Sequence, residues 1–276
     1  MRISDYRLIS RTAFFVLANL GFIGMTGLIY PFFYCYACPF ADAACPIGIL
    51  EHAILGDYLL FVYLIGFIGV IGIVFGRFFC GWACPVGFLQ DIFGFLMGNK
   101  KIKGLKLKPE TEHRLRCIKY FLKPETEHKL RYLKYIVLIG TVVAVYITGT
   151  LAFTLICPIG GLTATIPTLI IYQGIYGFGR FFWMKMLGVV LFFILTIISY
   201  RGWCKYFCPF GALISLFNKI SIVHLKVDEN ICTECMLCKK VCPMDIDLIK
   251  ENRSLECIEC LKCIDACPHK SVHVAH

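Results

Sequence analysis

Charged residues are scarce in this chain of 276 residues: they make up 17% of it, whereas soluble domains carry about 25%. The sequence also lacks a phosphate-binding loop, a flavin motif, a Cys-x-x-Cys-His haem site and a paired nucleophile and base. These absences exclude an ordinary cytosolic enzyme and leave electron and proton exchange as the chemistry of the chain. In their place stand 58% hydrophobic residues and 17 cysteines, a composition typical of a membrane protein that binds metal through thiolates.

Four apolar runs are long enough to cross a bilayer as helices, which takes about 20 residues. They cover residues 13–33, 58–79, 135–156 and 183–200. The loop 34–57 contains no Lys or Arg, and the loop 157–182 contains only Arg180. By contrast, residues 99–134 carry twelve Lys or Arg against four Glu. The positive-inside rule therefore predicts a multi-pass protein of the cytoplasmic (inner) membrane with both termini in the cytoplasm.

The basic segment contains a tandem repeat of fifteen residues, in positions 108–122 and 123–137. Each copy opens with Lys-Pro-Glu-Thr-Glu-His, a pattern typical of the first turn of a helix. We expect a short basic helix on the inner membrane surface and a second helix that leads into the third span. A role for His113 and His128 toward a quinone or haem stays open as an alternative. Cys117 has no counterpart in the second copy and is expected to be a free thiol.

The sequence Cys-Pro-x-Gly-x-Leu occurs four times. The boxes begin at Cys45, Cys84, Cys157 and Cys208. Another cysteine, Cys80 or Cys204, stands four residues before the second and the fourth box. The membrane part is thus one unit used twice, and we predict a pseudo-twofold axis along the membrane normal. Proline suits the first helical turn, so each box cysteine is expected at a helix N-cap, where a thiolate of an anionic cluster is favoured. The box glycine is expected to allow a bulky group to approach.

The duplicated unit predicts two sets of cysteine ligands in the membrane part. The inner set, expected to share one [4Fe–4S] cluster at the inner membrane face, is Cys80, Cys84, Cys204 and Cys208. The outer set is Cys35, Cys38, Cys45 and Cys157. Two interpretations of the outer set stay open, a further iron–sulfur cluster and disulfides; the shared box favours the cluster.

Short apolar segments follow the boxes, such as residues 47–55 and 88–97. Their length fits half-helices that dip back into the bilayer. A few acid–base groups stand near the expected bilayer edges. They are Glu51, His52 and Asp57 on the outer side and Asp91 on the inner side. Such groups are either ordinary interfacial residues or acceptors of quinol protons.

The C-terminal part contains two runs of Cys-x2-Cys-x2-Cys-x3-Cys-Pro. In bacterial two-cluster ferredoxins the fourth cysteine of each run ligates the other cluster. One predicted [4Fe–4S] ligand set is therefore Cys232, Cys235, Cys238 and Cys267. The other is Cys257, Cys260, Cys263 and Cys242. The predicted fold is an all-α membrane protein with two parallel repeats and a ferredoxin domain. Its parts are the first membrane repeat (1–98), a basic cytoplasmic linker (99–134), the second membrane repeat (135–222) and the ferredoxin domain (223–276).

The segments Phe79–Pro85 and Trp203–Leu213, together with the two ferredoxin runs, resemble the membrane-bound polyferredoxins. This group includes the four-span quinol dehydrogenase subunit of periplasmic nitrate reductase systems. The chain is also similar to the membrane core of the nitrous-oxide reductase regulator and to the cupric reductase of oxidase assembly. The resemblance implies electron transfer between a quinone pool or a cytoplasmic donor and an acceptor beyond the membrane. The nitrate-system relatives do not carry the outer cysteine set, which suggests an added redox centre.

Three functions follow as hypotheses. The first is an electron conduit, with quinol oxidation or another redox subunit at one end. The second is a reductase of a metal ion such as Cu(II), with the outer cysteines as the metal site. The third is a non-catalytic subunit that organises an ion-translocating redox complex. The sequence names neither the electron donor nor the acceptor, and nothing in it indicates nucleic-acid binding.

Overall fold

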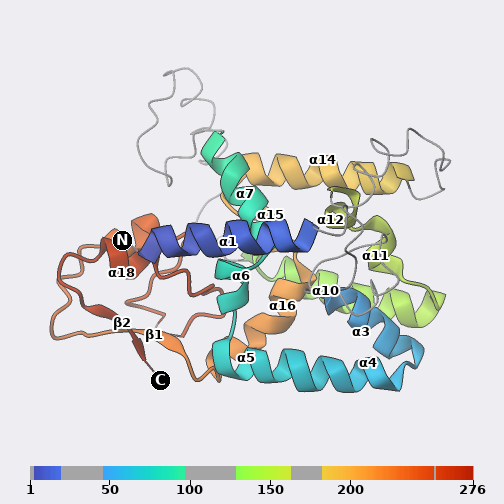
Figure 1. Ribbon diagram of the computed structural model, residues 1–276, viewed down its shortest axis with the longest axis horizontal. Helices are drawn as coiled ribbons and strands as arrows, with labels where there is room; N and C mark the ends of the chain where they lie inside the picture. The colour runs from blue at the N-terminus through green and yellow to red at the C-terminus, as the bar shows by residue number, and fades with distance from the viewer. Residues whose placement is uncertain (1–2, 20–45, 97–128, 163–181, 252, 276) are drawn as a thin grey trace.

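The computed structural model describes residues 3–19, 46–96, 129–162, 182–251 and 253–275 (Figure 1). The described residues are mostly helical. Helix α1 (Ile3–Asn19) lies at the N-terminus. The helices that follow it in the first half are α3 (Pro46–Leu55), α4 (Tyr58–Tyr63), the π-helix η2 (Leu64–Gly69), α5 (Val70–Phe75), α6 (Phe78–Trp82) and α7 (Pro85–Leu96).

The second half repeats the pattern of a long helix followed by short ones. Its helices are α10 (Leu133–Thr148), α11 (Ala152–Ile156), α12 (Pro158–Gly160), α14 (Phe182–Ile198), α15 (Gly202–Tyr206), α16 (Pro209–Ser215) and the 3-10 helix η4 (Leu216–Lys219). The C-terminal segment adds β1 (His224–Val227), α17 (Leu237–Val241), α18 (Lys262–Ala266) and β2 (Val272–Ala275). β1 pairs antiparallel with β2, with Leu225 opposite Val274.

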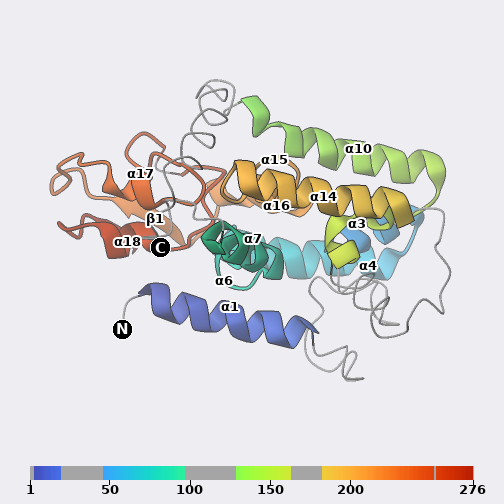
Figure 2. The ribbon, with the colours of Figure 1, turned by 90° about the horizontal axis from the view of Figure 1, so that it is seen from above.

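The long helices α10, α14 and the helix α4–η2–α5 run in roughly parallel directions, and the C-terminal segment lies at one end of them (Figures 1 and 2). The helices α4, η2 and α5 are continuous over Tyr58–Phe75, which is the one helix in the described residues that is long and apolar enough to cross a membrane. The apolar helices α10 and α14 are somewhat shorter, with 16 and 17 residues. Most of the first expected span, 13–33, lies outside the described residues.

The third expected span, 135–156, is not one helix. The helix α10 ends at Thr148, and Gly149 takes a left-handed conformation with φ of 63°. Glycine at this position commonly ends a helix because it has no Cβ to strain there. The chain then turns into the short helix α11, whose start is capped by the buried carboxylate of Glu51: it accepts hydrogen bonds from the backbone N–H of Phe153, at 2.7 Å, and from Thr154. Glu51 therefore joins the two halves of the chain.

Each of the four boxes begins a helix at its proline, as the sequence predicts. The helices are α3, α7, α12 and α16, and their first residues are Pro46, Pro85, Pro158 and Pro209. Proline has no N–H, and the N–H groups of the first helical turn have no acceptor within the helix. Proline at the first helical position therefore loses no hydrogen bond. The box cysteines in the described residues, Cys84, Cys157 and Cys208, therefore immediately precede helix N-termini.

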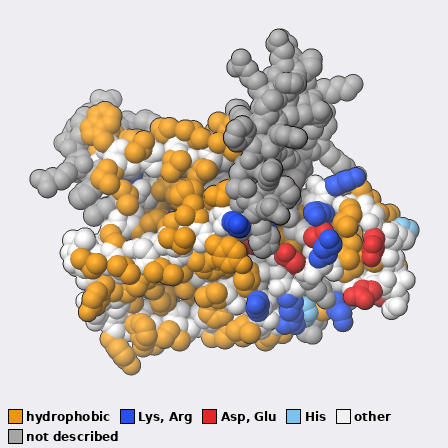
Figure 3. Space-filling model, turned by 180° about the vertical axis from the view of Figure 1, so that it is seen from behind, with side chains coloured by type: hydrophobic (Ala, Val, Ile, Leu, Met, Phe, Trp, Pro, Cys, Tyr) orange, Lys and Arg blue, Asp and Glu red, His pale blue; other side chains and the backbone are white. Residues whose placement is uncertain are grey.

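The face of the molecule shown in Figure 3 divides into an apolar and a charged region. Hydrophobic side chains cover the long-helix part, and Lys, Arg, Asp and Glu gather at the end formed by the C-terminal segment (Figure 3). Large apolar side chains such as Leu59 and Ile147 are 80% and 75% exposed. A soluble surface rarely carries so broad an apolar area.

Candidate metal centres

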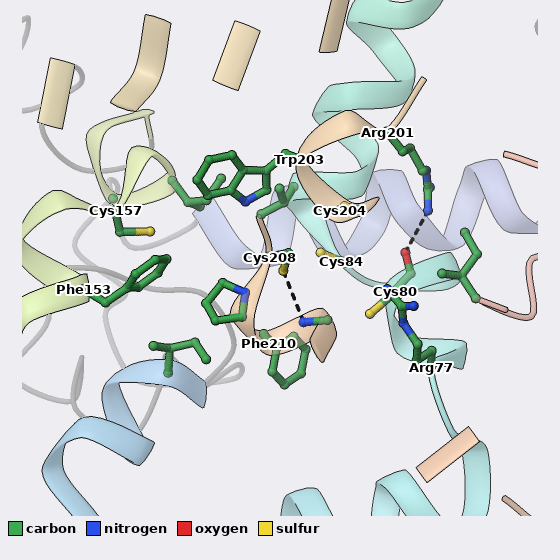
Figure 4. Close-up of a pocket in the computed structure, with 17 residues that line it drawn as sticks. Arg77, Cys80, Cys84, Phe153, Cys157, Arg201, Trp203, Cys204, Cys208 and Phe210 are labelled. Carbon is green, nitrogen blue, oxygen red and sulfur yellow. Dashed lines mark hydrogen bonds between the residues drawn. The ribbon is translucent and has the colours of Figure 1, made fainter. Parts of the chain in front are cut away.

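The four inner cysteines line a single buried cavity. Cys80 comes from α6 and Cys84 precedes α7, whereas Cys204 comes from α15 and Cys208 precedes α16 (Figure 4). Each half of the chain therefore contributes two thiols to one cavity. This is the grouping that the repeat in the sequence leads one to expect.

Three of the four thiols accept hydrogen bonds, Cys84 among them from the backbone N–H of Gly87. The backbone N–H of Gly211 donates to Cys208 Sγ at 3.3 Å, and the buried Gln90 side chain donates to Cys204 Sγ at 3.1 Å. Hydrogen bonds of this kind favour the thiolate form, which is the form that binds metal. Gln90 belongs to α7, so the first half supports a thiol of the second half.

Two fully buried arginines line the same cavity. Arg77 and Arg201 are equivalent positions of the repeat, each three residues before a cysteine. Each reaches the box of the other half. A Cβ on Gly211 would lie 3.1 Å from Arg77 Nη2, and a Cβ on Gly87 would lie 3.3 Å from Arg201 Nη2. In these two boxes, the glycine thus lies against a guanidinium from the opposite repeat.

Arg201 belongs to a buried network around Asp91. Its Nε and Nη2 donate to the Asp91 carboxylate at 2.8 and 2.9 Å, and Arg7 and Arg11 pair with the same carboxylate. All three arginines are buried, so the Asp91 carboxylate is surrounded by positive charge. Asp91 therefore serves as the counter-ion of buried arginines from α1 and from the second half.

Arg77 has a corresponding network around Glu256. Arg77 Nη1 lies 3.0 Å from the Glu256 carboxylate, which also pairs with the buried Lys134. Burial acts to raise the pKa of Glu256, but the charges of Arg77 and Lys134 lower it overall.

The two networks together hold five cations and two carboxylates. An excess of buried positive charge is costly unless an anion balances it. An iron–sulfur cluster with four thiolate ligands is such an anion, so the residues around the cavity fit it. In the described part of the chain, no three His, Cys, Asp or Glu side chains converge on a single ion. Ligands of a cluster bind separate iron atoms and are expected to surround a cavity instead.

Cys157 lies on the same cavity as the inner four cysteines (Figure 4). It packs with Phe153 against the apolar cluster that contains Cys84 and Trp203. Cys157 reaches this cavity because the chain turns after α10 into the short helices α11 and α12. The sequence predicts Cys157 in an outer set with three further cysteines, and that set stays a prediction for Cys157. Its expected partners Cys35, Cys38 and Cys45 lie outside the described residues, as does Cys117.

The other outer acid–base groups are engaged nearby. His52 Nδ1 lies 3.3 Å from the Asp57 carboxylate. Glu51 caps α11, as described above. These contacts fit the first of the two roles that the sequence leaves open for the three residues, that of ordinary interfacial groups.

One predicted ferredoxin set lines a pocket of its own. Its members are Cys232, Cys235, Cys238 and Cys267. Cys235 is exposed and Cys267 accepts or donates a hydrogen bond with Ser271 at 3.2 Å. This set therefore lies at the surface of the C-terminal segment.

The other ferredoxin set lies toward the membrane part. Its members are Cys242, Cys257, Cys260 and Cys263, of which Cys260 and Cys263 are buried within the hydrophobic core that contains Cys80. Ile258, between two of these cysteines, forms part of the wall of the inner cavity. A Cβ on Gly81 would overlap the carbonyl oxygen of Ile258. The Trp82 indole also donates to Glu259 O at 3.0 Å.

The second half holds the same set of cysteines from the opposite side. Lys205, the repeat equivalent of Gly81, is buried and pairs with Asp245 at 2.6 Å. Asp245 follows Cys242 by three residues. Both halves thus contact the C-terminal segment at loops that carry the cysteines of this second set.

Sequence profiles of two families match the chain. The family described as "4Fe-4S binding domain" matches residues 57–103 and 178–227, and the "4Fe-4S dicluster domain" matches residues 224–269. The uncharacterized protein MJ0750 of Methanocaldococcus jannaschii is 31% identical over 270 residues, which cover 96% of this chain and 93% of the relative. The ferredoxin-type protein NapH of Haemophilus influenzae is 27% identical over 205 residues, or 70% and 60% of the two chains.

The chain belongs to the NapH-type polyferredoxin family. A further relative is the methylamine utilization ferredoxin-type protein MauN of Paracoccus denitrificans, 26% identical over 230 residues, or 82% and 65% of the two chains. No solved structure gives a significant match. The polyferredoxin therefore contains 4Fe–4S domains and transfers electrons through iron–sulfur clusters.

The sequence does not identify Arg77 and Arg201 as cavity residues, although both occupy the same place in the two copies of the repeat. It indicates Asp91 only as an acid–base group and Gly81 only as part of a motif. The contacts of these residues depend on parts of the chain that are distant in sequence, which no local pattern reveals.

Proposed function

We propose that this polyferredoxin is a transmembrane electron wire. The observation that carries the proposal is the inner cavity: thiols from both halves of the membrane part line it, and the ferredoxin loop at Ile258 closes it. The 4Fe–4S clusters supply one-electron transfer when bound. The protein's own part is to hold the cysteine sets in series, to exclude water from them and to balance their charge.

The membrane topology is part of this proposal. Four spans cross the bilayer, with both termini and the 99–134 linker in the cytoplasm. Support comes from the exposed apolar side chains of Tyr58–Phe75, α10 and α14, and from the charged surface at the ferredoxin end (Figure 3). The half-helices that follow the boxes lie within the bilayer. An impermeant thiol reagent applied to intact cells should leave the ferredoxin cysteines unlabelled; labelling from outside would refute the topology.

The proposed ligand sets are those of the sequence. Two [4Fe–4S] clusters belong to the ferredoxin domain and a third to the inner cavity, held by Cys80, Cys84, Cys204 and Cys208. A fourth centre takes Cys157 with the outer cysteines. The hydrocarbon core is about 30 Å thick, too far for one efficient electron transfer. Cys157 beside the inner cavity shortens the remaining distance, which supports a series of centres over a single one.

Quinol oxidation is the proposed reaction at one end of the wire, on the resemblance to the quinol dehydrogenase subunits. A conduit between two protein partners is the second candidate, favoured by the surface position of Cys235. A metal-ion reductase and a purely organising subunit remain the alternatives. One assay distinguishes both alternatives from the wire. Only in a wire does a reductant on one side of a sealed membrane reduce the inner centre from the opposite side.

Iron content tests the inner ligand set. Replacing Cys84 or Cys208 by serine should remove about four irons per chain, because the two halves share one cluster. Cys117→Ser is the matched control, since that cysteine is expected to be no ligand, and it should keep all iron. An unchanged iron count in the Cys84 and Cys208 variants would refute the shared cluster.

Sealed proteoliposomes test the wire itself. An impermeant reductant outside should reduce the inner centres of the parent protein without added quinone. The reduction should fail when Cys45 and Cys157 are both replaced by serine. Equal rates in the two preparations would eliminate the wire, whatever the iron content.

A further inference from the structure

A cavity of about 280 Å³ lies where the long helices meet the ferredoxin domain. Three separate segments form it: the start of α10, the end of η4 and the loop around Arg253. Arg131, Lys219 and Arg253 contribute one cation from each segment, and Tyr132 and Tyr135 add two aromatic rings. This cavity is separate from both cavities lined by cysteines.

The charges of the cavity favour an anion. Of its two carboxylates, Glu256 is already paired with Arg77 and Lys134. Glu251 accepts a hydrogen bond from the Ser254 hydroxyl at 2.8 Å.

The cations are also held in place by the protein. Arg253 Nη1 donates to Lys219 O at 2.9 Å, and Arg131 Nη2 donates to Met244 O at 3.0 Å. Because the backbone fixes these two arginines, less side-chain freedom is lost when an anion binds between them. Two of the three cations are therefore held in place before any anion binds.

The position of the cavity indicates the source of the anion. On α10, Ile136, Ile139 and Val143 are exposed and continue away from the cavity along one face of the helix. Close to Lys219, Ile220 and Ile222 are also exposed apolar residues. The cavity thus lies at the boundary between the apolar and the charged surface. An anionic head attached to an apolar chain fits both sides of that boundary.

We propose that this cavity binds the phosphate headgroup of an anionic membrane lipid. The acyl chains lie on the exposed face of α10, and the phosphate lies between Arg131, Lys219 and Arg253. Because these residues come from the membrane part and from the ferredoxin domain, the lipid connects the two. The proposal rests on the proposed membrane location of the helices, and it is independent of the iron–sulfur ligand sets.

Native mass spectrometry of the full protein with its clusters tests the site. The protein is exchanged into nanodiscs of phosphatidylcholine with or without phosphatidylglycerol, and the lipid that survives release is counted. We expect one retained phosphatidylglycerol. Each cation near an anionic lipid contributes about fivefold to binding, so the double variant Lys219→Gln, Arg253→Gln should bind about 25-fold more weakly. Lys226→Gln, which removes an exposed charge on β1, is the matched control.

The conservative double variant Lys219→Arg, Arg253→Lys keeps the charges and should retain the lipid. Equal retention in the parent and in the glutamine variant would overturn the site. Displacement by inorganic phosphate alone, or retention of a quinone in place of phosphatidylglycerol, would overturn the assignment to a lipid. Iron content is measured on the same samples. Failure of the electron wire would appear in the iron and reduction assays, whereas failure of this site would leave both unchanged.

Discussion

Replacing Arg201 by glutamine should lower the reduction potential of the inner centre without removing it. Arg201 lines the cavity, is fully buried and lies against the box at Gly87. Its positive charge favours the reduced, more negative state of an anionic cluster. A unit charge about 7 Å away, in a medium with an effective dielectric constant of about 20, contributes about 2 kcal/mol. That energy corresponds to about 100 mV for a one-electron couple.

The surrounding network makes this substitution interpretable. Without Arg201, the Asp91 carboxylate keeps Arg7 and Arg11 as partners, so no bare charge is left in the interior. The repeat-equivalent substitution Arg77→Gln likewise leaves Glu256 paired with Lys134. Both variants should therefore retain four irons at the inner site and shift the potential in the same direction.

The measurement is a redox titration followed by electron paramagnetic resonance, with iron content determined on each sample. Arg201→Lys keeps the charge and should restore most of the potential. Lys226→Gln removes the same charge from the exposed face of β1 and should change the potential by less than about 20 mV, because exposed charges are screened. A potential in Arg201→Gln that equals the parent value, with full iron, would refute the role of the arginine charge.

Three other outcomes follow from the same contacts. Gly81→Ala should weaken the packing of the ferredoxin domain and destabilise the protein by about 1–3 kcal/mol, because the added Cβ overlaps Ile258 O. In thermal unfolding, the control Gly140→Ala, whose Cβ would have nothing within 4 Å, should match the parent. An unaffected Gly81→Ala would contradict the contact. Asp91→Asn should lower the free energy of unfolding by about 3–5 kcal/mol, because three buried arginines lose their carboxylate. Replacing the exposed Asp57 by Asn should change that free energy by less than about 0.5 kcal/mol. Equal effects of the two substitutions would be evidence against the network. Removal of the iron by oxidation and chelation should lower the melting temperature, since the buried excess of positive charge then has no anion; an unchanged melting temperature would argue against that balance.

The sequence predicts those features that local chemistry determines. The helix start at each box follows from proline, and the structure has it at Pro46, Pro85, Pro158 and Pro209. The grouping of cysteines from the two halves follows from the repeat. Hydropathy predicts the third span as one helix because it does not detect where a helix ends. Glycine does not interrupt a long apolar run, so the left-handed Gly149 that ends α10 leaves no trace in the hydropathy.

The remaining features depend on contacts between distant segments. The position of Cys157 follows from the fold-back of α11, which Glu51 fixes from about a hundred residues away in the chain, and no local pattern encodes that distance. The exchange of Arg77 and Arg201 between the boxes similarly requires the two halves to be packed together first. An alignment of the two halves would have shown the arginines but not their partners.

The difference between Gly81 and Lys205 shows how a duplicated unit meets a single ferredoxin domain. The two halves are equivalent around the cavity, where each gives two thiols and one arginine. The ferredoxin domain has no such symmetry, so the two equivalent positions face different loops. Position 81 faces the backbone at Ile258 and has room only for glycine. Position 205 faces Asp245 and carries a lysine. Exchanging the two residues should therefore lose both contacts at once, and the double variant should release the ferredoxin domain to proteolysis while Lys205→Arg remains resistant. A protease-resistant exchange variant would show that the domain is held elsewhere.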